Sequence, residues 1–151
     1  MAYEVKIRVY DLSKGQARLI SRNILGVQID GIWHSSVEIH GKEIFLSHEI
    51  TCTVPGQTRY GTPTYVHEYG ISHTTEEDLN EMLDVLREKY NRHTYNMLEN
   101  NCNHFADDLC FFLLEKKLPQ YIMDVHEIVS KTPFGSHFLK NSFNFNPGAR
   151  D

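Results

Sequence analysis

Two stretches of the chain alternate between hydrophobic and polar residues, a period of two that predicts strands with one buried face. In the first stretch, Val5, Ile7 and Val9 alternate with Lys6 and Arg8. The predicted strands span residues 5–9, 31–40, 43–46 and 65–69. The connection over residues 47–64 contains two Gly and two Pro. We expect it to be a long loop with room for short strands, and loops of this length often carry function.

A tight hairpin is predicted between the second and third strands. Gly41 and Lys42 separate them, and a two-residue turn with Gly in the first position is a frequent hairpin connection. The two strands are therefore expected to pair in an antiparallel arrangement.

Apolar residues recur at helical spacing in the remaining segments. The predicted helices span residues 16–25, 74–90, 102–116 and 124–129. The second helix is the clearest, because Thr74 and Glu77 have the spacing of a capping box ahead of an apolar stripe. Asn100 or Asn101 is expected to cap the third helix, and Pro119 prevents its continuation.

Composition limits the class of protein. The chain has 151 residues, 40% hydrophobic and 23% charged, as in an ordinary globular protein of one domain. A net charge of −5 without a Lys/Arg run argues against nucleic-acid binding. The longest apolar run, over residues 109–114, is too short for stable membrane insertion, and no signal peptide is recognisable. We expect a cytoplasmic or nuclear protein with a domain over residues 1–140 and a disordered tail over 141–151.

Three cysteines are present, and their number and spacing argue against disulfide bonds. Cys102 follows the predicted cap, so its sulfur is expected at the positive end of a helix dipole, where the pKa of a thiol falls. The free N–H groups of a helix start can also stabilise an oxyanion. The alternative is a small buried residue that fills the helix start, which is the commoner role of a cysteine. Cys110 lies mid-helix and is expected in the core, whereas Cys52 lies in the long loop.

A thiol nucleophile needs a base, and His34 is the best placed of the nine histidines. Its predicted strand puts it on the face opposite Trp33 and Val37, so we expect it to face a cleft or the helix that begins at Cys102. A surface histidine is the alternative interpretation. His104 is only two residues from Cys102, an offset that points it to another side of the helix. No zinc-ligand spacing and no G-x-S-x-G motif occur, so we expect neither a metal, nor another cofactor, nor a serine nucleophile.

Several segments resemble the PPPDE peptidases, the desumoylating isopeptidases, and most of all the desumoylating isopeptidase 1 branch. The matching segments are VKIRVYDLSKG (5–15), GIWHSS (31–36), YN (95–96), NCN (101–103) and TPFG (132–135). The resemblance covers about residues 4–138. It implies a circularly permuted papain-like α+β fold, with an antiparallel sheet and packed helices, in which the histidine precedes the cysteine. It assigns His34 as the catalytic base and Cys102 as the nucleophile.

The same resemblance implies a function. It indicates a cysteine isopeptidase that hydrolyses the glycine–lysine isopeptide bond of SUMO- or ubiquitin-conjugated proteins, without a cofactor. It also implies a homodimer with its active-site groove at the subunit interface. A protein S-acyl thioesterase with the same dyad and a non-catalytic module that binds ubiquitin-like modifiers are the alternatives. Residues 47–63 differ from the family pattern, which leaves the choice of substrate open, because loops usually set it.

Overall fold

A five-stranded antiparallel sheet forms the centre of the structure, in the order β4-β3-β2-β1-β5. The computed structural model describes residues 1–132 and residue 135 of the chain. The strands are β1 (Tyr3–Asp11), β2 (Trp33–Ile39), β3 (Lys42–Leu46), β4 (Ile50–Thr53) and β5 (Tyr65–Ser72). As the alternation predicts, Val5, Ile7 and Val9 of β1 are buried, whereas Lys6 and Arg8 are partly exposed.

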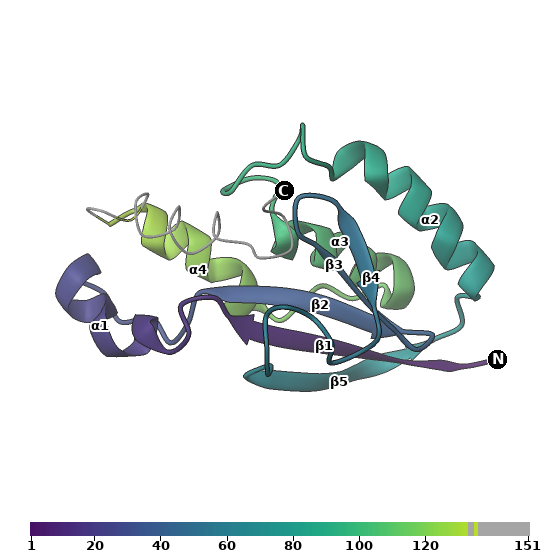
Figure 1. Ribbon diagram of the computed structural model, residues 1–151, viewed down its shortest axis with the longest axis horizontal. Coiled ribbons are helices and arrows are strands. Elements are labelled where there is room, and N and C mark those ends of the chain that lie inside the picture. The colour runs from purple at the N-terminus through teal and green to yellow at the C-terminus, as the bar shows by residue number, and fades with distance from the viewer. Residues whose placement is uncertain (133–134, 136–151) are drawn as a thin grey trace.

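Helices cover one face of this sheet. They are α1 (Gln16–Leu25), α2 (Glu76–Lys89), α3 (Cys102–Leu114) and α4 (Gln120–Ser130). Figure 1 shows α2, α3 and α4 on one side of the sheet and α1 beyond the ends of the strands. Apolar side chains of α3, among them Phe105 and Leu109, join Ile7 and Val37 of the sheet in one core. This arrangement confirms the predicted α+β class, an antiparallel sheet with packed helices, and is consistent with a papain-like fold.

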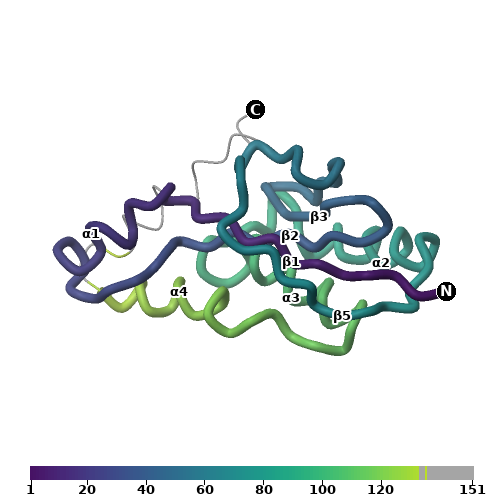
Figure 2. The backbone as a smooth tube through the Cα atoms, turned by 90° about the horizontal axis from the view of Figure 1, so that it is seen from below, coloured from purple at the N-terminus to yellow at the C-terminus, as the bar shows by residue number. Residues whose placement is uncertain are grey.

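The connection between β4 and β5, residues 54–64, lies on the opposite side of the sheet from α3 and α4 (Figure 2). The sheet is therefore covered by helices on one face and partly by this connection on the other. Within the described residues, none of the helices combines the length and the apolar character that crossing a membrane requires.

The hairpin between β2 and β3 turns one residue earlier than predicted. Ile39 pairs with Lys42, so the two turn residues are His40 and Gly41. Both have positive φ, 55° and 70°, as a type I′ turn requires, and the twist of this turn matches that of the strands. Histidine is one of the side chains that tolerate this conformation, and its Nε2 donates to the carbonyl of Thr74 at 2.9 Å. The prediction was wrong because it required Gly in the first turn position.

Several element ends also differ from the predictions. Thr75, not Thr74, caps α2, since its hydroxyl accepts the N–H of Asp78 at 3.1 Å, and the predicted capping box is absent from this helix start. α3 ends two residues early, with Glu115 in the left-handed conformation. α4 begins at Gln120, directly after Pro119, rather than at the predicted residue 124. Proline fits a helix start, because no N–H is needed there. The predicted domain end at residue 140 and the tail over 141–151 lie outside the described residues.

Candidate active site

The start of α3 is fixed by hydrogen bonds on both sides of its cap. Asn101 Oδ1 accepts the N–H groups of Asn103 at 2.8 Å and His104 at 3.2 Å. In return, the N–H of Asn101 donates to Nδ1 of His104 at 3.1 Å, which completes a capping box. The cap was predicted, but the part played by His104 was not, because glutamate or glutamine usually holds that position. Cys102 is thereby held in the first turn of the helix.

Asn103 joins this helix start to β2. Its Nδ2 donates to the carbonyl of Trp33 at 2.7 Å, and its Oδ1 accepts the hydroxyl of Ser35 at 2.7 Å. Asn103 and Ser35 are fully buried, so both hydrogen bonds are shielded from water. The two residues that it contacts flank His34 in the sequence. The helix that carries Cys102 is therefore fastened to the strand on either side of the candidate base.

The Cys102 thiol lies against the edge of β2. The backbone N–H groups of Ser35 and Asn103 hydrogen-bond to its sulfur and favour the thiolate, but only 3% of Cys102 is exposed. Burial outweighs these N–H groups and raises the pKa of Cys102 to about 12. The expectation of a lowered pKa is therefore wrong for this closed arrangement, because the helix start lies inside the protein rather than in water.

His34 lies beneath a cover of aromatic side chains. Tyr60 stacks on its ring with centroids 3.9 Å apart, and Phe45 and Tyr10 contact the ring at 5.7 and 5.8 Å. Only 1% of His34 is exposed, and burial lowers its pKa to about 3. The residue therefore lies under Tyr60 rather than in an open cleft. Within the described residues, its Nε2 has no hydrogen-bond partner.

The fold thus places the two predicted residues on elements that the Asn103 hydrogen bonds join. The thiol of Cys102 contacts the N–H of Ser35, and the imidazole belongs to the preceding residue of β2. Burial raises the pKa of Tyr95, and negative charge on Cys102 or Tyr60 would raise it further, so Tyr95 lies in the neighbourhood of both. The site combines a buried neutral thiol at the start of α3 with a buried neutral imidazole on β2, and an aromatic cover lies on the imidazole.

Comparison with known proteins places this chain in a family. The sequence matches the PPPDE peptidase domain over residues 3–143. The chain belongs to the PPPDE peptidase family. Membership confirms the prediction of a cysteine-type hydrolase and agrees with the matching segments around His34 and Cys102.

Relatives of this PPPDE protein cover most of its length. Desumoylating isopeptidase 1 of Rattus norvegicus is 44% identical over 135 residues, 88% of this chain and 80% of the relative. The Homo sapiens protein of the same name has the same identity and coverage. A DeSI-like protein of Arabidopsis thaliana is 29% identical over 124 residues, 78% of this chain and 53% of the relative.

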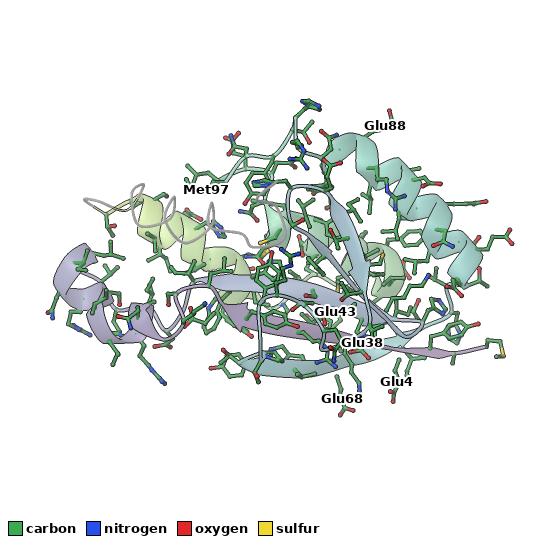
Figure 3. All side chains as sticks on the ribbon, viewed as in Figure 1. Glu4, Glu38, Glu43, Glu68, Glu88 and Met97 are labelled. Carbon is green, nitrogen blue, oxygen red and sulfur yellow. The ribbon has the colours of Figure 1, made fainter. Side chains whose placement is uncertain are left out.

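A buried carboxylate supports the aromatic cover of this PPPDE domain. Glu43 of β3 is fully buried, accepts a very short hydrogen bond from the Tyr10 hydroxyl and accepts the N–H of Gly56 at 3.0 Å. Arg8 supplies positive charge, with its Nε 2.8 Å from Glu38 and 4.0 Å from Glu43. Figure 3 shows Glu38 and Glu43 beside each other on the sheet, as their strand pairing requires. Glu43 thus ties the connection that carries the aromatic cover to the sheet.

Sequence reasoning missed Asn103, Glu43 and Tyr60, which the structure adds to the site. Asn103 belongs to the matching segment NCN, but that match gave it no role. Among the described residues, no group of three or more His, Cys, Asp or Glu side chains is arranged to hold a metal ion.

Proposed function

We propose that this protein is a cysteine isopeptidase that hydrolyses the glycine–lysine isopeptide bond of SUMO conjugates, with Cys102 as nucleophile and His34 as base. The observation that carries the proposal is the attachment of the α3 start to β2. Asn103 hydrogen-bonds to Trp33 and Ser35, the residues on either side of His34, and the Ser35 N–H contacts the thiol of Cys102. Acyl transfer by a thiol needs a base within reach of the nucleophile, and this attachment joins the helix start that carries Cys102 to the strand that carries His34.

The proposed chemistry proceeds in two steps. His34 accepts the thiol proton as the sulfur of Cys102 attacks the glycine carbonyl, and the backbone N–H of Cys102 stabilises the oxyanion. The tetrahedral intermediate breaks its carbon–nitrogen bond as protonated His34 gives its proton to the leaving lysine amine. Water, deprotonated by His34, then releases the glycine carboxyl group from the acyl-enzyme.

The closed arrangement holds both groups neutral. Burial raises the pKa of Cys102 and lowers the pKa of His34, so proton transfer between them is unfavourable until water or substrate enters. The Tyr60 ring that lies on His34 is the cover that has to move. We therefore propose that entry of the modifier tail beside Tyr60 activates the pair.

SUMO-conjugated proteins are the proposed substrates because relatives with 44% identity are named desumoylating isopeptidase 1. Ubiquitin-conjugated proteins are the alternative substrates. We further propose a homodimer, as the family resemblance implies, and a location in the cytoplasm or nucleus.

The test is a substrate panel with matched variants. We expect the wild-type protein to cleave a fluorogenic SUMO tail, and we expect Cys102→Ser and His34→Gln each to lower kcat/KM at least about 1,000-fold. Cys52→Ser and His93→Gln change the same residue types at exposed positions and should keep full activity. Circular dichroism confirms that each variant is folded.

The panel also includes a ubiquitin tail and an acyl thioester. Turnover of the thioester alone would replace the isopeptidase by an S-acyl thioesterase with the same dyad. Turnover of none by a folded wild-type protein would favour a binding module. Retained turnover by Cys102→Ser removes this cysteine from the mechanism.

A further inference from the structure

A second concave region lies between the start of β5, the residues before β2, and α4. It encloses about 400 Å³. Four rings and two carboxylates contribute to its lining: Trp33, Tyr65, His67, Tyr121, Asp30 and Asp124. We call it the β5–α4 groove. The proposed mechanism uses none of these side chains.

The rings of the groove offer aromatic faces to a ligand. Trp33 and Tyr121 meet at 88° with centroids 5.8 Å apart, and Tyr65 and Tyr121 meet at 82° and 6.0 Å. The indole of Trp33 packs directly on Gly31, where an added Cβ would lie 2.4 Å from the ring. Tyr65 and Tyr121 remain 45% and 37% exposed. The aromatic wall is thus fixed at its base and accessible at its surface.

The charge of the groove is negative. Asp30 and Asp124 are the two carboxylates, and among the described lining residues there is no Lys or Arg. Asp124 accepts a hydrogen bond from Gln120 at 2.7 Å, a neutral partner that leaves its charge uncompensated. Aromatic faces and carboxylates both attract cations. A positively charged side chain is therefore stabilised by cation–π contacts and by charge-assisted hydrogen bonds, and a neutral side chain by neither.

The groove continues toward the candidate dyad. A neighbouring hollow shares Asp30, Trp33 and Tyr65 with it and is also lined by Tyr60, the residue stacked on His34. The basic side chains nearby, Lys14, Arg18 and Arg59, line this neighbouring hollow and not the groove. An extended polypeptide that occupies both hollows therefore runs from the groove to Tyr60, the ring that covers His34. We infer that the β5–α4 groove binds a Lys or Arg side chain of the conjugated polypeptide. That the ligand is part of the substrate rests on the proposed function, whereas its positive charge follows from the groove itself.

The chain supplies its own probe for this inference. Trp33 is the only tryptophan, so intrinsic fluorescence reports directly on the groove. The full-length protein is titrated with acetyl-Gly-Gly-Arg-Gly-Gly-amide and with the same peptide carrying citrulline, which is neutral and nearly the same shape as arginine. We expect a saturable change in Trp33 emission and a Kd about tenfold lower for the arginine peptide.

Matched variants identify the side chains that distinguish the arginine peptide from the citrulline peptide. The double change Asp30→Asn with Asp124→Asn should abolish the preference for arginine. The double change Glu4→Gln with Glu88→Gln removes the same charge from two exposed side chains outside the groove lining, which Figure 3 shows at the surface, and it should keep the preference. Equal affinity for the two peptides, no saturable change in emission, or equal loss in both double variants would overturn the inference.

The fluorescence titration needs no turnover, so its outcome is separate from that of the substrate panel. Arginine-selective binding by a protein that cleaves no conjugate leaves the cation site standing and removes the proposed function. Cleavage of a conjugate by a protein that binds both peptides equally leaves the proposed function standing and removes the cation site.

Discussion

At the scale of single residues, Asn103 does most to join the two elements that carry the candidate catalytic groups. Its amide uses both its donor and its acceptor on residues 70 and 68 positions away, Trp33 and Ser35. Both partners are buried, so truncating the amide leaves buried polar groups without partners and allows the helix start to shift from the strand.

We predict that Asn103→Ala lowers kcat about 100-fold with a much smaller effect on KM, because a displacement of about 1 Å between reacting groups costs that much. Steady-state kinetics on the preferred conjugate, below the melting temperature of the variant, measure it. Asn80→Ala, on the exposed face of α2, is the matched control. An Asn103→Ala enzyme with normal kcat would mean that the dyad is aligned by other contacts.

At the scale of elements, the connection over residues 54–64 decides access to the site. It holds Tyr60 on the ring of His34 and is tied to the sheet where Gly56 donates to the buried carboxylate of Glu43. A buried thiol reacts with reagents only when the structure around it opens, so the rate at which Cys102 is modified reports on that opening.

We predict that in the wild-type protein iodoacetamide modifies Cys102 more slowly than the exposed Cys52, and that Tyr60→Ala accelerates modification of Cys102 about tenfold. Peptide mapping by mass spectrometry follows each cysteine separately. Val54→Ala, at an exposed position of the same connection, should leave the rate unchanged. If Tyr60→Ala behaves like this control, another segment governs access to the thiol.

At the scale of the whole molecule, the buried imidazole of His34 makes global stability depend on pH. Its pKa is lowered from 6.5 to about 3 in the folded protein. Between these values the unfolded chain binds a proton that the folded protein does not. The free energy of unfolding therefore falls as the pH falls from 6.5 toward 3, and this contribution is complete only above the unfolded pKa.

We predict that His34 accounts for about 2 kcal/mol of the stability that the wild-type protein loses between pH 7 and pH 5. Urea denaturation at the two pH values measures the loss. His34→Gln should lose about 2 kcal/mol less than wild type, whereas His93→Gln, an exposed control, should lose as much as wild type. The same loss in all three proteins would show that His34 is accessible to protons in the folded state.

The sequence alone determined the elements whose physics is local. The alternation around Val5 and Val9 sets a strand with one buried face, and the asparagine before Cys102 sets the start of α3, because side-chain period and capping depend on residues a few positions apart. The matching segments around His34 and Cys102 also identified the family from sequence.

Only the tertiary structure decided the surroundings of those residues. Trp33 and Ser35 as partners of Asn103, and Tyr60 on His34, are contacts between segments far apart in the chain, which no local pattern encodes. The thiol of Cys102 shows the consequence most directly. The helix start favours the charged form of the thiol, but packing by distant segments removes water from it. The free-energy cost of desolvating the thiolate exceeds the stabilisation that the nearby N–H groups provide, so the pKa is raised.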